Sequence, residues 1–161
     1  MSDATYELRP AAPRWTHVAL RVRDIEASIA WYTEFTTLEV LARNQDDLGF
    51  GVWLAHPDQS ENPFVLVLAQ FLPATDPFAG HPQEVLAPFA HLGIELPSRE
   101  ALDEMAARGE AAGCLAMPPQ QMPPPVGYVC MLEDPDGNRV EYSYDQGVYA
   151  AAQEKWGAPV D

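Results

Sequence analysis

The sequence has no long apolar run. Its longest, from Phe64 to Phe71, covers eight residues and is interrupted by Gln70, whereas a membrane-spanning helix needs about 20 apolar residues. The N-terminal residues show no basic patch followed by an apolar stretch, so no signal peptide is expected. Only two cysteines occur, Cys114 and Cys130, too few for a disulfide framework and without the spacing of metal ligands. These absences favour a cytoplasmic protein that does not span a membrane.

Positive charge is also scarce. The 161 residues include 9 Lys and Arg against 24 Asp and Glu, a formal net charge of −15 at pH 7. Nucleic acids and anionic membranes are bound through clusters of Lys and Arg, so neither is an expected partner. The length and the 47% hydrophobic content fit one domain, or two fused half-domains, with a core large enough to fold without staples.

One stretch of the chain occurs twice. Thr-His-Val-Ala-Leu-Arg-Val-Arg-Asp at 16–24 returns as Ala-His-Leu-Gly-Ile-Glu-Leu-Pro-Ser at 90–98, and the offset between the two histidines is 91 − 17 = 74 residues. In each copy a histidine opens an alternating strand, and Asp24 or Ser98 follows seven positions later as a candidate helix N-cap. The repeat predicts two copies of one small structural unit.

Hydrophobic periodicity and turn residues predict the order βαβββ in each half of the chain. In the first half we expect a helix at 24–35 and strands at 15–22, 38–43, 49–55 and 64–71, the last two forming a hairpin. In the second half we expect a helix at 98–113 and strands at 90–96, 114–117, 127–133 and 139–144. The strand at 114–117 is expected to stop before Pro118 and Pro119, which cannot donate ladder hydrogen bonds. The fold class is therefore α+β with paired βαβββ modules.

These elements divide the chain into five segments. We expect an N-terminal lead-in at 1–14, a first module at 15–71 and a second module at 90–145. A Pro-rich linker at 72–89 separates the modules, and a C-terminal helix and tail follow at 146–161.

Three motifs together resemble the vicinal oxygen chelate superfamily, which includes glyoxalase I, bleomycin-resistance proteins, fosfomycin-resistance transferases and extradiol dioxygenases. They are the opening Thr-His-Val-Ala-Leu-Arg-Val-Arg-Asp-Ile-Glu-Ala-Ser-Ile-Ala-Trp-Tyr-Thr, the internal Ala-His-Leu-Gly-Ile-Glu-Leu and the closing Asp-Pro-Asp-Gly-Asn-Arg-Val-Glu-Tyr. The resemblance covers about residues 15 to 145. It implies sheets that curl around a cavity, metal ligands on the first and last strands of each module, and a homodimer.

Position by position, the resemblance assigns His17, His91 and Glu141 as the metal ligands. Two imidazoles and one carboxylate suit one divalent transition metal, Fe, Mn, Ni, Co or Zn, with positions left open for a bidentate oxygen ligand. The alternative for each histidine is a hydrogen-bonded structural role. The equivalent positions of the two histidines favour the metal, and so does Glu141, which would otherwise be a buried, unpaired carboxylate. Glu141 is also the candidate catalytic base.

The sequence departs from individual branches of the family. Glyoxalase I has a further carboxylate ligand on the fourth strand, where this chain is apolar and only Gln70 could offer an oxygen. Extradiol dioxygenases have a histidine and a tyrosine at places that here hold Phe64 and Met131. Fosfomycin-type transferases need several cations, and the one inward-facing base is Arg21.

A second set of residues is assigned to substrate binding. Arg21 resembles the arginine with which glyoxalase I holds a glutathione carboxylate, although it could instead pair with Glu95, the equivalent residue of the repeat. Both lie four residues, roughly 13 Å, beyond their histidines. Trp53 and Tyr128 are candidates for an apolar pocket wall, and packing in the core is the alternative for both. Gln70 is a further candidate for contact with the substrate.

The sequence thus favours a metal-dependent lyase or isomerase of the glyoxalase type, acting on a small substrate that chelates the metal through adjacent oxygens. Extradiol-type dioxygenase chemistry is the second hypothesis. The third is a non-catalytic drug- or metabolite-binding protein of the bleomycin-resistance type, which would not require the metal ligands.

Overall fold

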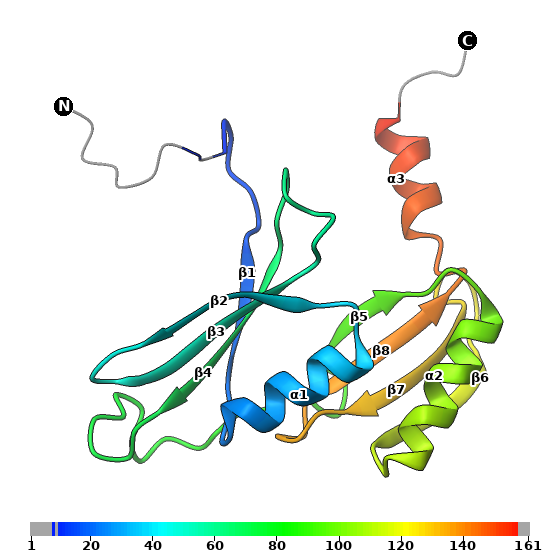
Figure 1. The fold of residues 1–161 in the computed structure, drawn as a ribbon. Coiled ribbons are helices and arrows are strands. Elements are labelled where there is room, and N and C mark those ends of the chain that lie inside the picture. The colour runs from blue at the N-terminus through cyan, green and yellow to red at the C-terminus, as the bar shows by residue number, and fades with distance from the viewer. Residues whose placement is uncertain (1–7, 9, 158–161) are drawn as a thin grey trace.

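The computed structural model describes residue 8 and residues 10–157, which form two four-stranded mixed sheets and three helices (Figure 1). The first module contains, in chain order, β1 (His17–Arg21), α1 (Ile25–Phe35), β2 (Glu39–Gln45), β3 (Gly49–Ala55) and β4 (Val65–Phe71). Its sheet, here called the first sheet, has the strand order β1-β4-β3-β2, with β1 parallel to β4 and the other pairs antiparallel.

The second module repeats this plan. It contains β5 (His91–Glu95), α2 (Arg99–Ala111), β6 (Leu115–Gln121), β7 (Tyr128–Glu133) and β8 (Arg139–Tyr144), followed by α3 (Val148–Trp156). The second sheet has the order β5-β8-β7-β6, and again only the first pair is parallel. The predicted α+β fold of paired βαβββ modules is confirmed.

Local sequence accounts for where the two long helices begin. The Asp24 side chain accepts hydrogen bonds from the backbone N–H groups of Glu26 and Ala27, and the Ser98 side chain accepts one from Ala101. These bonds satisfy donors that a helix start otherwise leaves unpaired. Both residues of the internal repeat therefore do the same structural work, as predicted.

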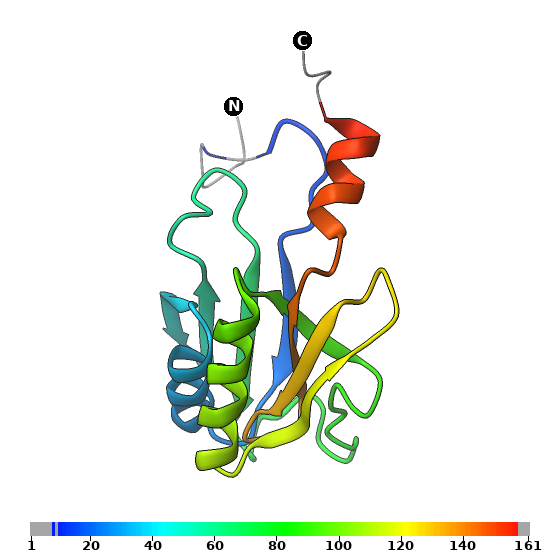
Figure 2. The ribbon, with the colours of Figure 1, turned by 90° about the vertical axis from the view of Figure 1, so that its right-hand side faces the viewer.

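The two modules share one core. Helices α1 and α2 lie side by side on the same side of the two sheets (Figures 1 and 2). Buried side chains from both helices and both sheets pack together, and the largest include Tyr32, Leu54, Leu102, Leu132 and Tyr142. We call the opposite face of each sheet, which no helix covers in the described part of the chain, its open face.

Strand β6 corrects one prediction. It was expected to end before Pro118, but it continues through Pro118 and Pro119 to Gln121. It lies at the edge of the second sheet, where only one side of the strand must supply hydrogen bonds, and its register with β7 shifts between Met117 and Gln120. An edge strand can tolerate proline in this way.

Helix α3 stands apart from the rest of the structure (Figure 1). It has no buried residue, and its Val148, Tyr149 and Trp156 are exposed. Within residues 10–157, no helix is both long enough and apolar enough to cross a membrane.

Candidate functional site

Strand alternation decides which side chains reach the open faces. On β1, Leu20 packs into the core between the sheet and the helices, so His17 and Arg21 lie on the open face. On β5, Leu92 and Ile94 pack against the same core, so His91 and Glu95 lie on the open face of the second sheet. The equivalent residues of the repeat are therefore on equivalent faces, as the sequence predicted.

His91 and Glu141 meet on the open face of the second sheet. Nε2 of His91 lies 3.6 Å from Oε2 of Glu141, and the residues come from the paired strands β5 and β8, in which Gly93 is opposite Glu141. Nδ1 of His91 donates a hydrogen bond to the carbonyl oxygen of Phe89 at 2.5 Å. Because a carbonyl oxygen can only accept, the neutral ring carries its proton on Nδ1 and presents the Nε2 lone pair to Glu141. Nε2 and Oε2 are then both hydrogen-bond acceptors. A cation bound between them, or a proton on Nε2, would remove their mutual repulsion.

Glu141 is buried, at 6% exposed, and its carboxylate has a partner that the sequence did not predict. Nε2 of Gln146 donates to Oε1 of Glu141 at 2.9 Å. The expectation that Glu141 would be unpaired without a metal is therefore wrong. Oε1 is occupied, and Oε2 is the atom left facing His91.

His17 lies on the other sheet. It is exposed, and its Nδ1 shares a hydrogen bond with Oγ1 of Thr16 at 2.9 Å. Among residue 8 and residues 10–157, no group of three or more His, Cys, Asp or Glu side chains lies close enough together to hold a metal ion. One chain thus brings His91 and Glu141 together and leaves His17 separate from them.

The donor atoms fit a divalent transition metal. Each histidine has Nδ1 engaged in a hydrogen bond, and Glu141 has Oε1 engaged, so one nitrogen or oxygen of each residue remains for a cation. Two ligands of one such ion, each at about 2.1 Å, lie at most roughly 4.2 Å apart. The 3.6 Å between His91 and Glu141 is within that limit.

Arg21 is not available to an anionic substrate in the way the sequence suggested. Its guanidinium forms an ion pair with Asp76, which comes from the Pro-rich linker. Glu95 accepts a hydrogen bond from the backbone N–H of Gln146 at 3.1 Å, and its Oε2 is buried without a hydrogen-bond partner among the described residues. Within one copy of the chain, Arg21 therefore pairs with Asp76 and not with Glu95, the alternative that the sequence left open.

Two further substrate-binding predictions place their side chains on the wrong face. Oε1 of Gln70 accepts a hydrogen bond from the backbone N–H of Ile25 at 2.8 Å, so Gln70 points toward the start of α1. The hydroxyl of Tyr128 donates to Asp103 of α2 at 2.7 Å, and the Arg99 guanidinium lies 3.6 Å from its ring centre. Neither residue reaches an open face. Trp53 does, and it is 48% exposed there.

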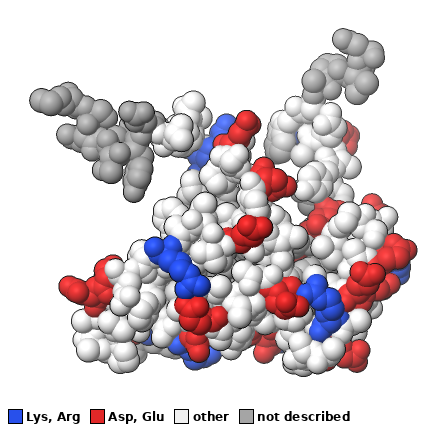
Figure 3. Space-filling model, viewed as in Figure 1, with Lys and Arg blue, Asp and Glu red and all other residues white. Residues whose placement is uncertain are grey.

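A cleft of about 630 Å³ separates the two modules. Aliphatic side chains from both sheets form its walls, including Val18, Leu66, Leu92 and Ile94, and Glu95 also lines it. This volume is typical of a small-molecule site. Acidic side chains predominate on the face of the molecule shown in Figure 3, where the basic side chains lie among them.

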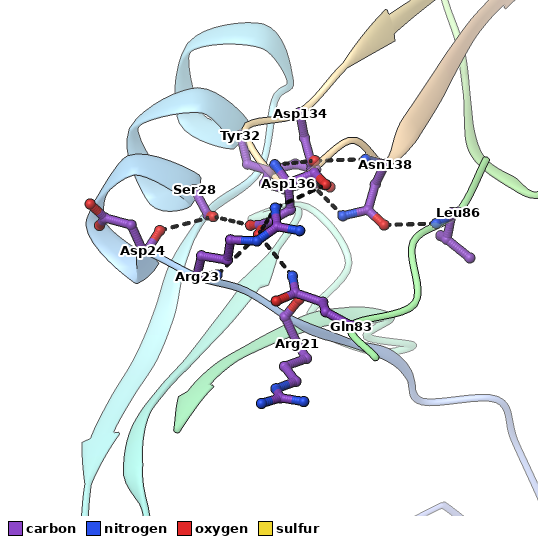
Figure 4. Close-up of polar contacts among 10 residues, drawn as sticks. All are labelled: Arg21, Arg23, Asp24, Ser28, Tyr32, Gln83, Leu86, Asp134, Asp136 and Asn138. Carbon is purple, nitrogen blue, oxygen red and sulfur yellow. Dashed lines mark hydrogen bonds and ion pairs between the residues drawn. The ribbon is translucent and has the colours of Figure 1, made fainter. Parts of the chain in front are cut away.

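The turn of residues 134–138 between β7 and β8 ties the modules together (Figure 4). Asp134 accepts a hydrogen bond from the hydroxyl of Tyr32 on α1 at 2.8 Å. Asp136 accepts hydrogen bonds from the backbone N–H of Arg23 at 3.0 Å and from Nε2 of Gln83 at 2.8 Å. The sequence predicted these residues as a hairpin turn and as part of a family motif, and the structure shows in addition that their side chains join the second module to the first.

Burial shifts the pKa of three groups in the shared core of the two modules. Burial and the neighbouring Asp134 carboxylate raise the pKa of Tyr32 far above its ordinary value. Burial also raises the pKa of Tyr142, whose hydroxyl donates to the carbonyl oxygen of Phe35 at 2.6 Å. The pKa of the Cys130 thiol is raised to about 12, chiefly by burial. All three groups are therefore neutral at pH 7.

Comparisons with known proteins agree with this architecture. Residues 14–142 match the family described as the Glyoxalase/Bleomycin resistance protein/Dioxygenase superfamily. An uncharacterized protein of Pseudomonas aeruginosa is 42% identical over 136 residues, which are 84% of this chain and 91% of that protein. A glyoxylase/bleomycin resistance protein/dioxygenase domain from Frankia is 25% identical with a TM-score of 0.62, covering 82% of this chain and 97% of that one. A mutant of the fosfomycin resistance protein FosX of Listeria monocytogenes, in complex with Mn(II) and a dihydroxypropylphosphonic acid, is 17% identical. Its TM-score is 0.61, and the match covers 87% of this chain and 97% of FosX.

Proposed function

Because this chain belongs to the Glyoxalase/Bleomycin resistance protein/Dioxygenase superfamily, which contains metal-dependent enzymes and non-catalytic binding proteins, we propose that it is a metal-dependent lyase or isomerase. Its substrate is a small molecule with two adjacent oxygens. The observation that carries the proposal is the His91–Glu141 pair, in which Nε2 and Oε2 face each other at 3.6 Å on an open face.

The proposed site uses His17, His91 and Glu141 for one divalent transition metal, Fe, Mn, Ni, Co or Zn. When bound, such a metal supplies Lewis-acid polarisation of a carbonyl or enolate oxygen. The hydrogen bond from Nδ1 of His91 to Phe89 orients the ring, and in the neutral ring it leaves the Nε2 lone pair directed at Glu141. If its Oε2 dissociates from the metal, Glu141 would serve as the base that takes a proton from the carbon beside the carbonyl and returns it to the neighbouring carbon. Trp53, exposed on the first sheet, offers an apolar surface to the rest of the substrate.

The third ligand is proposed to come from a second copy of the chain. His17 is exposed on the first sheet, whereas His91 and Glu141 are on the second. In a two-fold homodimer, the open face of the first sheet of one copy would meet the open face of the second sheet of its partner, which creates two equivalent sites. The exposed Trp53 and Phe89 favour burial of these faces against another protein surface.

Mixing two inactive variants tests this arrangement. His17→Ala and His91→Ala should each abolish binding of about one equivalent of metal per chain, measured by elemental analysis after incubation with Zn(II) or Fe(II). A heterodimer of the two variants has one site with both lesions and one intact site. Unfolding and refolding an equimolar mixture should therefore restore about a quarter of the wild-type metal content. No recovery on mixing would contradict the shared site, and no metal in the wild type would contradict the proposed function.

The surroundings of Glu141 favour lyase or isomerase chemistry over ring cleavage by dioxygen. Met131 lies opposite Glu141 in the β7–β8 pairing, so a thioether stands where the dioxygenase resemblance would require a phenol. A thioether is neither an acid nor a base in proton transfer. Dioxygenase activity toward a catechol should therefore be absent even in an Fe(II)-loaded protein, and its detection would reverse this ranking.

The inter-module cleft favours a second candidate, a non-catalytic drug- or metabolite-binding protein. The cleft has a volume of about 630 Å³, and its walls combine aliphatic and aromatic side chains with several polar and charged ones, which suits an amphipathic small ligand without any metal. Metal content separates the two functions. A wild-type protein that binds amphipathic compounds in calorimetry but takes up no Zn(II), Fe(II) or Ni(II) would be a binding protein.

A further inference from the structure

The chain makes an unusual turn immediately after β8. Asp145 has a φ of 59°, and it is the one non-glycine residue with a positive φ in the described part of the chain. Gly147 follows with a φ of 78°. A left-handed conformation is uncommon for a residue with a side chain, although aspartate adopts it more readily than most. Gln146 lies between these two left-handed residues.

Gly127 braces this turn. A Cβ atom at Gly127 would lie 2.4 Å from the carbonyl oxygen of Tyr144 and 2.6 Å from that of Asp145. The backbone at 144–145 therefore packs directly against residue 127, and no larger residue would fit there. This contact holds the turn in the conformation that returns Gln146 toward the open face of the second sheet.

Gln146 contacts two acidic residues of that face, Glu95 and Glu141. Its backbone N–H donates to Oε1 of Glu95 at 3.1 Å, and its side-chain Nε2 donates to Oε1 of Glu141 at 2.9 Å. Its own Oε1 accepts a hydrogen bond from the hydroxyl of the buried Ser143 at 3.4 Å. The hydroxyl thus orients the amide so that the NH₂ group points toward Glu141.

From these contacts we infer that Gln146 is a positioning residue, which fixes the Glu141 carboxylate so that Oε2 faces Nε2 of His91. The last torsion of a glutamate side chain has a broad, shallow preference, so a carboxylate without a partner would rotate. With Oε1 held by the amide, one oxygen remains for a cation. The role toward a metal rests on the proposed function, whereas the contact between Gln146 and Glu141 exists without a metal.

Co(II) binding measures the role toward the metal. Outer partners that orient metal ligands typically contribute 10–100-fold to metal affinity. We expect Gln146→Met, which keeps the length of the side chain but removes the amide, to weaken Co(II) binding by about 10–100-fold in calorimetry. It should also alter the visible absorption of bound Co(II). Gln120→Met, at an exposed position on β6, is the matched control and should bind Co(II) like the wild type. Equal affinities for Gln146→Met and the wild type would overturn the role.

The metal-free protein measures the contact itself. In ¹H–¹⁵N spectra, the side-chain amide signals of Gln146 are identified by their loss in Gln146→Met. They should be displaced from the position of free glutamine amides, should move to that position in Glu141→Ala, and should stay displaced in Glu95→Ala. If the amide signals of Gln146 do not move in Glu141→Ala, the inference is wrong even if the wild type binds Co(II). If the wild type binds no metal, the proposed function fails, while these amide signals still decide whether Gln146 positions Glu141.

Discussion

Replacing Tyr32 with phenylalanine removes the hydrogen bond that joins α1 of the first module to the turn of the second. The hydroxyl of Tyr32 lies 2.8 Å from Oδ2 of Asp134, and both residues are buried. A hydrogen bond to a charged group contributes about 1.5–3 kcal/mol. Asp134 retains donors from Asp136 and Asn138, so the remaining carboxylate is not left unpaired. We therefore expect Tyr32→Phe to lower the free energy of unfolding at pH 8 by about 1.5–3 kcal/mol.

This loss should depend on pH in a defined direction. The pKa of Tyr32 is raised in the folded protein, so the unfolded chain releases the phenolic proton first as the pH rises through its ordinary value of 10.0. Above pH 10 the unfolded state therefore binds fewer protons, and each such tyrosine lowers the free energy of unfolding by about 1.4 kcal/mol per pH unit. The contribution of Tyr32 is thus complete below pH 10 and lost above it. Tyr142, whose pKa is also raised, should lower the free energy of unfolding above pH 10 in the wild type and in Tyr32→Phe alike.

Urea denaturation at pH 8 and pH 11, at one fixed protein concentration, measures both effects. The difference between the wild type and Tyr32→Phe should shrink by about 1.4 kcal/mol at pH 11. Tyr128→Phe is the matched control, because its hydroxyl also donates to an aspartate, at 2.7 Å, but on the exterior of the molecule. It should cost less than about 0.5 kcal/mol. A difference that is absent at pH 8, or identical at both pH values, would refute the assignment of this bond as an inter-module tie.

Two further predictions concern a thiol and an ion pair. Because Cys130 is fully buried and its pKa is raised to about 12, only the half-buried Cys114 should react with Ellman's reagent at pH 8 until the protein is unfolded in urea, and rapid labelling of both thiols of the native chain would contradict this. Asp76→Asn should free the Arg21 guanidinium and strengthen the binding of a small carboxylate such as phenylacetate by several-fold in calorimetry. An unchanged affinity would show that Arg21 does not face the binding site.

The sequence predicted the elements well because their signals are local. Strands β3 and β8 match the predicted ranges 49–55 and 139–144, which were placed from the turn sequences beside them. The caps of α1 and α2 were predicted at Asp24 and Ser98, where a short polar side chain precedes the helix. Strand β6 was predicted too short, because its tolerance of proline depends on its place at the sheet edge, which the local sequence does not contain.

Only part of the candidate site was predicted from the sequence, because strand pairing places some of its residues and an irregular turn places another. His91 and Glu141 are brought together by strand pairing, which the repeat and the family motifs specify. Gln146 depends on two left-handed residues in a turn, and no pattern in the sequence marked that turn as part of the site. Tyr128 could have been placed correctly, because pairing of β7 with β8 puts it opposite Tyr144, on the face that packs against the helices.

Asp76 illustrates the limit of pairwise reasoning within the repeat. Arg21 was expected to bind a substrate or to pair with its repeat equivalent, Glu95. Its partner instead comes from the linker, which belongs to neither copy of the repeat and lies 55 residues away in the chain. A symmetrical argument cannot include a segment that has no symmetrical counterpart. The same linker contacts Asp136 and Asn138 through Gln83 and Leu86.

Metal binding and association of two copies should be thermodynamically coupled if His17 comes from the partner. A ligand that binds only the assembled site stabilises the assembly by mass action, and the coupling is reciprocal. Zn(II) should therefore lower the dimer dissociation constant in sedimentation at low protein concentration, and the apparent Zn(II) affinity should fall as the protein is diluted. In His17→Ala, Zn(II) should leave the dimer dissociation constant unchanged. Zn(II) affinity that is independent of protein concentration through the dissociation range would mean that all ligands come from one chain. The two open faces would then have to approach each other within a single copy, which requires breaking the Tyr32–Asp134 and Arg23–Asp136 contacts that hold the modules in place.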